Sequence, residues 1–249
     1  MTLTFPNLPA LDNYSLGLTL TAAGELSFPL FSGATPPASI GLPDLANSKL
    51  LPYDGSFEFR GEDFAAVFTE SLCDVPLGHA TPANLSLALL GVPTILNPAN
   101  LADFATYGPG NTVQYTLGSG NGTTTGINSI TFVGGNKGGG ADLFIFWDII
   151  VPAGTTTFAI PPVAVSKPMF APGFYFVNVG AVRFPFPGFD FATFFDQNFP
   201  SNLAAVEMLM ECEADVSHNF TVGQAPLVME PGVRAAFERR ATLFDTEAR

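Results

Sequence analysis

Hydrophobic and polar residues alternate over short stretches of the chain, and a period of two is typical of β-strands with one buried face. The alternation is plain at residues 16–20 and 113–117, and it is longest at residues 206–216. A helix beginning near Ser201 is the competing interpretation of the last stretch, but a period of two fits nearly every position and predicts a strand. The outer face of that strand would carry Glu207, Glu211, Glu213 and Asp215.

Residues 143–151 depart from this alternation because almost every position is apolar. A strand that is buried on both faces has such a pattern. We therefore expect residues 143–151 to form a central strand in the second half of the chain.

Proline and glycine interrupt the whole chain, with 22 Pro and 25 Gly among 249 residues. They prevent long helices, and strand signals recur between them about every ten residues. A hydrophobic content of 47% with only 12% charged residues argues against intrinsic disorder. The sequence predicts an all-β fold of tandem antiparallel β-sandwiches, either immunoglobulin- or fibronectin-like or jelly-roll-like.

An internal repeat appears when the chain is compared with itself at an offset of 118 residues. Phe57 then aligns with Tyr175 and Phe59 with Val177, within a shared order of strand and turn signals. We interpret this as a tandem duplication, with a long hairpin loop inside one larger sandwich as the alternative. The predicted units are a first sandwich at residues 1–118, a linker at 119–128, a second sandwich at 129–230 and a C-terminal helical tail at 231–249.

Residues 146–163 read FWDIIVPAGTTTFAIPPV. This segment resembles the strand, turn and strand of fibronectin-III-like and related regulatory β-sandwich domains of bacterial surface proteins. In that pattern a Trp strand precedes a Pro-x-Gly-Thr-Thr-x-Phe-x-Leu-Pro segment, and Ile160 stands here in place of the Leu. The resemblance implies a β-sandwich and supplies no catalytic residue, because this fold hosts many unrelated functions.

Two segments are candidates for subunit contacts. Residues 183–200 contain seven Phe and three Pro, so the segment is partly loop, and so aromatic a loop either packs on its own core or forms an interaction patch. The tail at 231–249 has apolar residues at helical spacing, and it either packs on its own sandwich or docks on a neighbouring subunit. The candidate interface residues are Phe184, Phe186, Phe189, Phe191, Phe194, Phe195, Val233, Phe237 and Phe244.

The formal net charge of −13 would repel a phosphate backbone and an anionic membrane surface. We expect no direct nucleic-acid partner and no membrane span, because prolines interrupt the longest uncharged stretch at residues 75–102. No secretory signal is visible in residues 1–30.

For Cys73 and Cys212, 139 residues apart, we expect two buried free thiols, with a single disulfide as the alternative.

No motif of a catalytic, metal or cofactor site occurs in the chain. His79 and His218 lack a second ligand at metal-binding spacing, so we interpret both as structural and expect no metal or cofactor. The pairs Glu62–Asp63 and Glu211–Glu213 offer carboxylates for glycoside hydrolysis or for calcium, but no flanking motif accompanies them. A solvated strand face that discourages edge pairing is the preferred interpretation of both pairs.

These features predict a non-catalytic structural protein that builds or decorates a multi-subunit assembly, by self-association or with another assembly protein. A surface layer, a filament and a virion shell all fit, which favours an extracellular surface or a virion as the location. The alternative is a module that binds carbohydrate or another polymer, with Trp147, Tyr175 or exposed Phe residues as stacking platforms. A hydrolase that uses a carboxylate pair is the third interpretation.

Overall fold

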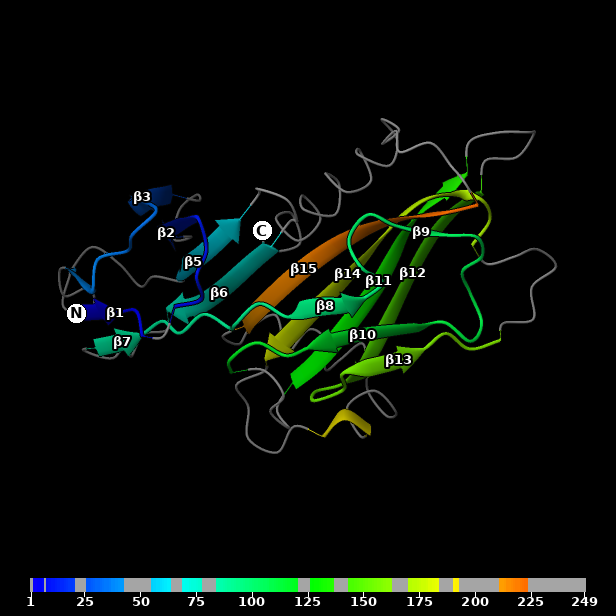
Figure 1. The fold of residues 1–249 in the computed structure, drawn as a ribbon. Helices are drawn as coiled ribbons and strands as arrows, with labels where there is room; N and C mark the ends of the chain where they lie inside the picture. The colour runs from blue at the N-terminus through cyan, green and yellow to red at the C-terminus, as the bar shows by residue number, and fades with distance from the viewer. Residues whose placement is uncertain are drawn as a thin grey trace.

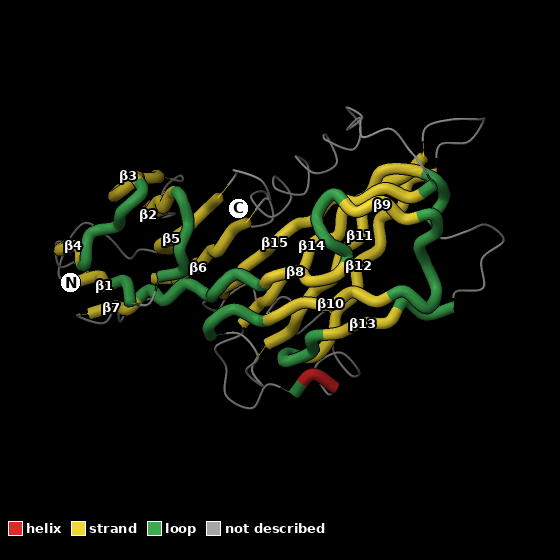
Figure 2. Tube along the Cα trace, viewed as in Figure 1, coloured by secondary structure: helices red, strands yellow, loops and turns green. Residues whose placement is uncertain are grey.

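A computed structural model describes residues 2–6, 8–20, 26–42, 55–63, 69–77, 84–120, 126–136, 143–162, 170–183, 190–192 and 211–223. Within these residues the protein is all-β, which confirms the predicted fold class, with fifteen strands and a helical turn only at residues 191–192. Figure 2 shows this composition of strands and connecting loops. The helical tail predicted at residues 231–249 lies outside the described residues.

One large sheet extends across both halves of the described chain (Figure 1). Its strand order is β12-β11-β14-β15-β6-β5-β2-β3, and all neighbours in this order are antiparallel. β9 adds a parallel pairing at the far end of β15. The strands are β2 (Asn13–Leu20), β3 (Leu26–Gly33), β5 (Gly55–Asp63), β6 (Thr69–Leu77), β9 (Ala102–Phe104), β11 (Gly126–Asn136), β12 (Leu143–Pro152), β14 (Gly173–Arg183) and β15 (Glu211–Val222).

Two three-stranded sheets lie against the large sheet, and each covers one half of it (Figure 1). The order β4-β1-β7 packs on the half that contains β2 and β5, and the order β13-β10-β8 packs on the half that contains β11 and β14. Among the described residues, each half therefore forms a sandwich of two sheets. The strands are β1 (Thr2–Thr4), β4 (Ser39–Gly41), β7 (Asn84–Ser86), β8 (Thr94–Asn97), β10 (Thr112–Thr116) and β13 (Thr157–Ala159).

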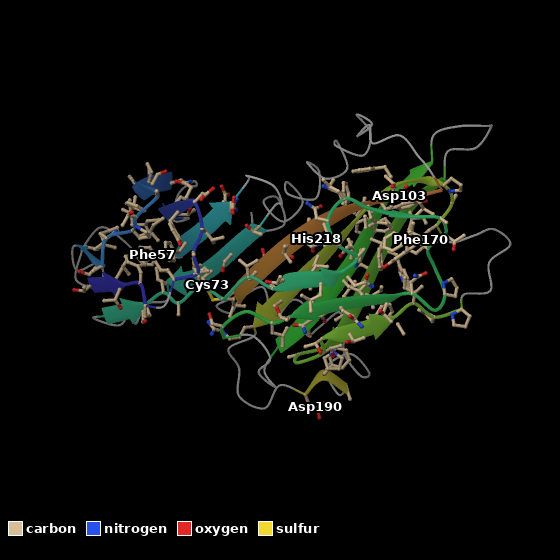
Figure 3. All side chains as sticks on the ribbon, in the orientation of Figure 1. Phe57, Cys73, Asp103, Phe170, Asp190 and His218 are labelled. Atoms are coloured by element: carbon tan, nitrogen blue, oxygen red, sulfur yellow. A yellow bond between two sulfur atoms is a disulfide. The ribbon has the colours of Figure 1, made fainter. Side chains whose placement is uncertain are left out.

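β15 belongs to both sandwiches. Its residue Ala214 packs in the first core with Phe57, whereas Val216 and Phe220 pack in the second core with Phe170. Figure 3 labels Phe57 and Phe170, one in each core. The two cores therefore lie side by side on the same face of one sheet, and β15 is the strand at which they meet.

The strand predicted at residues 206–216 is confirmed over its described part, and β15 continues it to Val222. Residues 206–210 lie outside the described part of the chain. From Cys212 to Val216 every second side chain is buried against the small sheets, while Glu213 and Asp215 on the opposite face are half-buried. The buried positions are Cys212, Ala214 and Val216.

The two halves of the large sheet have the same strand order from edge to centre, β3-β2-β5-β6 and β12-β11-β14-β15. The offset of 118 residues moves β4 onto β13, and it moves Phe57 onto Tyr175, both of which are fully buried. β9 and β10 precede residue 119 in the chain, yet they pair with β15 and β13. The division of the chain at residues 119–128 stays a prediction, and residues 121–125 lie outside the described part.

Cys73 and Cys212 form a disulfide, so the expectation of two free thiols is wrong. Cys73 lies on β6, labelled in Figure 3, and Cys212 lies directly opposite on β15. Because β6 is the last strand of the first half of the sheet and β15 that of the second, the bond fastens the two halves where they meet. A spacing of 139 residues along the chain carries no sign of this neighbourhood.

The second core is built mainly of aromatic rings. Tyr107 lies 4.8 Å from Phe220 and 5.2 Å from Phe170 between ring centroids, and such tilted and edge-on contacts are favourable. Its hydroxyl is buried and has no hydrogen-bond partner among the described residues, and this burial raises the pKa of Tyr107. Tyr175 in the same core donates its hydroxyl to the carbonyl oxygen of Ala171 at 2.7 Å, and burial raises the pKa of Tyr175 to about 12.

The replacement Tyr107→Phe is expected to stabilise the protein by about 1 kcal/mol, because it removes a buried hydroxyl that makes no hydrogen bond. Tyr175→Phe is the matched control, and it is expected to destabilise by about 1 kcal/mol because the carbonyl of Ala171 loses its donor. Urea unfolding of both variants measures the two effects. If Tyr107→Phe destabilises the protein as much as Tyr175→Phe does, then the hydroxyl of Tyr107 has a hydrogen-bond partner and this interpretation is wrong.

Candidate interface at the free edge of the large sheet

β12 ends the large sheet, and among the described residues it pairs only with β11. The expectation of a central strand at residues 143–151 is therefore wrong. The inward side chains of Ile145, Trp147 and Ile149 pack on the second core and are half-buried. On the outer face, Phe146 is 61% exposed and Ile150 is 36% exposed. A strand whose sequence is apolar on both faces thus lies at an edge.

The backbone groups at this edge can be assigned from the disulfide. In an antiparallel sheet, successive residues direct their N–H and C=O to alternate neighbours, and opposed Cα atoms are closer in the pairs that do not hydrogen-bond, about 4.5 Å instead of 5.5 Å. The Cα atoms of Cys73 and Cys212 are 4.1 Å apart, so this pair is of the closer kind. The backbone groups of Cys212 therefore point away from β6 and toward β14.

Asn219, an odd-numbered residue of β15, provides a check on this assignment. The alternation directs its backbone groups to the side of β15 opposite β14. Its N–H indeed donates to Oδ1 of Asn100 at 3.0 Å, and its carbonyl accepts from the N–H of Leu101 at 2.6 Å. Both partners belong to the loop that leads into β9, which pairs with β15 on that side.

The registers from β15 through β14 and β11 to β12 run without interruption. Carried through them, the alternation directs the odd-numbered residues of β12 to β11 and the even-numbered residues to the free edge. Phe146, Asp148 and Ile150 therefore present their N–H and C=O groups at the edge, and the same residues carry the outward side chains. Pro152 lacks an N–H and ends this row of donors.

Asp148 is the charged residue of β12, and its carboxylate is tied to its own sheet. Thr131 on β11 donates its hydroxyl to Oδ1 of Asp148 at 2.5 Å. The same row of the sheet continues on β14 and β15, where Nδ2 of Asn178 donates to Oγ of Ser217 at 3.1 Å. The hydrogen bond therefore holds the carboxylate of Asp148 toward β11 and away from the free edge.

The opposite end of the large sheet is β3, and it differs from β12. β3 contains Pro29 in its middle, and a register shift interrupts its pairing with β2 between Leu16 and Gly17. Proline and bulges are two of the features by which natural sheets protect their edges from further pairing. β12 has neither feature before Pro152, since its ten pairs with β11 are consecutive.

The interface residues predicted from the sequence lie mostly outside the described residues. Phe191 alone among them is described, and it is half-buried. Phe146 and Ile150 were not among the candidates. The signal for them is the apolar run at residues 143–151, which by itself fits burial within one chain equally well.

The candidate catalytic and ligand-binding residues do not converge on one site in the described part of the chain. Nδ1 of His218 lies 2.9 Å from the carbonyl oxygen of Pro98, which only accepts, so His218 holds a loop in place. Glu62 pairs with Arg60 at 3.4 Å, and Asp63, as the next residue of a strand, points to the other face. The side chain of Glu211 and the whole of His79 lie outside the described part of the chain.

Of the predicted stacking platforms for carbohydrate, Trp147 and Tyr175 are at least half-buried, whereas Phe28 and Phe146 are exposed. Tyr175 is fully buried, and Trp147 is half-buried against the rings of Phe132 and Phe158, at 5.8 and 6.0 Å between centroids. Among the described residues no three His, Cys, Asp or Glu side chains gather to hold a metal ion. No helix in that part of the chain has the length and apolar character needed to cross a membrane.

Comparison with protein-family models, with curated proteins and with solved structures found no match to the chain.

Proposed function

We propose that the protein is a non-catalytic structural subunit that builds or decorates a multi-subunit assembly, such as a surface layer, a filament or a virion shell. The observation that supports it most is the edge of the large sheet at β12, where no second strand pairs with β12 among the described residues. Apart from Asp148, this ten-residue strand is apolar on both faces, and it exposes Phe146 and Ile150.

Such an edge is unfavourable to leave open in a protein that acts alone. Its N–H and C=O groups invite pairing with another strand, and natural monomers protect their edges with charges, prolines or covering segments. Large exposed apolar side chains beside the edge add surface that association would remove from water. An edge strand with these properties fits a subunit whose neighbours complete the sheet.

The disulfide supports the same proposal. Cys73 and Cys212 fasten the two halves of the sheet, which suits a subunit that bears load between its neighbours. Disulfides persist in oxidising surroundings such as cell surfaces and virions. These are the settings in which surface layers, filaments and shells are found.

Sedimentation velocity over a wide range of protein concentration tests the proposal. We expect the mean mass to rise with concentration, and to rise further with added salt, because salt screens the repulsion between subunits of charge −13. The proposal is contradicted by a species that stays monomeric at the highest concentration and at high salt.

A further inference from the structure

The structure assigns a partner to the free edge: we propose that β12 pairs with β12 of a second copy of this chain, antiparallel and about a two-fold axis that passes beside Trp147. This inference rests on the proposed function and specifies its contact. The result is one sheet that continues through both subunits.

The backbone groups along the free edge of β12 are best satisfied by another β-strand. Phe146, Asp148 and Ile150 present backbone donors and acceptors in a row, and only an extended chain satisfies such a row completely. A two-fold contact brings the same surface of both subunits together, so each edge meets an identical row. β3 is the other end of the large sheet, and Pro29 together with the nearby bulge makes it a poor alternative partner.

The charge distribution favours a copy of the same strand. The whole chain carries a net charge of −13, yet β12 contributes only Asp148 to it over ten residues. Thr131 already holds that carboxylate by a hydrogen bond. β12 is therefore a place at which two such acidic molecules approach with little local repulsion, and Phe146 and Ile150 gain burial there.

The register follows from three requirements. Paired residues must have their side chains on the same face, so the axis passes beside a residue and not between two residues. Nearly the full strand is paired when the axis lies beside Trp147, which pairs residues 143–151, or beside Asp148, which pairs residues 144–152. The second register sets Asp148 directly against its own copy, and like charges in that position are destabilising.

With the axis beside Trp147, Phe146 lies opposite Asp148 of the second copy, and Ile145 lies opposite Ile149. Trp147 meets its own copy in one of the closely spaced pairs. It is the single Trp of the chain, so its fluorescence reports directly on the contact. We expect the emission of Trp147 to change over the same concentration range in which the sedimenting mass rises.

Opposite charges introduced at Phe146 test the contact and its register. Glu at this position would face Asp148 of the partner twice, so we expect Phe146→Glu to weaken association by about tenfold or more. Phe146→Lys would instead form two cross-strand ion pairs and is expected to associate more strongly than Phe146→Glu. Phe28→Glu is the matched control, because Phe28 is 45% exposed on β3, at the other end of the sheet.

Cysteine cross-linking tests the register independently and leaves Asp148 in place. In the closely spaced pairs the geometry is that of Cys73 and Cys212, whose Cα atoms lie 4.1 Å apart. We expect a mixture of Ile145→Cys and Ile149→Cys to form a disulfide-linked dimer under mild oxidation, and neither variant to do so alone. Circular dichroism and thermal melts establish that each variant is folded before it is compared.

The outcomes separate this inference from the proposed function. Association that is undiminished in Phe146→Glu, or that is lost in Phe189→Ser and Phe194→Ser instead, overturns the β12 contact and leaves the structural role standing. Equal weakening by Glu and Lys at position 146, with no cross-link in the mixture, overturns the register. A monomer under all conditions overturns the proposed function together with the contact.

Discussion

Removal of the disulfide by the double replacement Cys73→Ala and Cys212→Ala is expected to lower the free energy of unfolding by about 3–5 kcal/mol. The bond closes a loop of 139 residues, and the entropy that a cross-link removes from the unfolded chain grows with the length of the loop. It also fastens β6 to β15, the strands at which the two sandwiches meet. Guanidinium unfolding without reductant measures the effect.

Reductant supplies the control for the cysteine replacement. Wild-type protein treated with dithiothreitol should lose a similar amount of stability, while the double variant should not respond, because it has no bond to reduce. Mass spectrometry should find the untreated wild-type chain lighter than the reduced chain by two hydrogens. A wild-type unfolding curve that reductant leaves unchanged would contradict the structural role of the bond.

Local pattern was sufficient to predict the strands, because alternation states directly which side chains must leave water. Leu16 and Leu18 on β2 and Val113 and Tyr115 on β10 are buried as the period of two predicts. The aligned pair Phe57 and Tyr175 likewise occupies equivalent buried positions in the two halves. These predictions needed only the chain within a few residues of each position.

Local patterns do not predict which strands pair when those strands lie far apart in the sequence. Cys73 and Cys212 become opposite residues only because β15 lies between β14 and β6, and this order depends on long-range pairing that no local pattern encodes. The same limit applies to β9 and β10, which precede the predicted linker but pair with strands that follow it.

The error at residues 143–151 has a different cause. An apolar run states that both faces of a strand favour burial, but it does not state which molecule supplies the cover. The structure supplies cover on the inner face through the second core and leaves Phe146 exposed at the outer face. A strand that lies at the edge of its own sheet, but pairs with a strand of another subunit, would have the apolar sequence of a central strand. The apolar sequence of β12 is therefore consistent with the proposed contact.

Truncation of Phe220 is the second large effect we expect. Its ring lies in the middle of the second core, fully buried, 4.8 Å from Tyr107, 5.6 Å from Tyr175 and 5.9 Å from Phe104 between centroids. Phe220→Ala is expected to destabilise by about 3–5 kcal/mol, because burial is lost and a cavity remains. Urea unfolding, at protein concentrations too low for the subunits to associate, measures this loss of stability. Phe146→Ala, at an exposed ring, should stay within about 0.5 kcal/mol of wild type.

The same variant shows whether the two sandwiches unfold as one unit. Phe220 lies on β15, which also supplies Ala214 to the first core, so damage to one core should be felt in the other. We expect Phe220→Ala in the second core and Phe57→Ala in the first core to shift a single common transition. Two transitions, with each variant shifting only one of them, would show that β15 and the disulfide join two independently folding units.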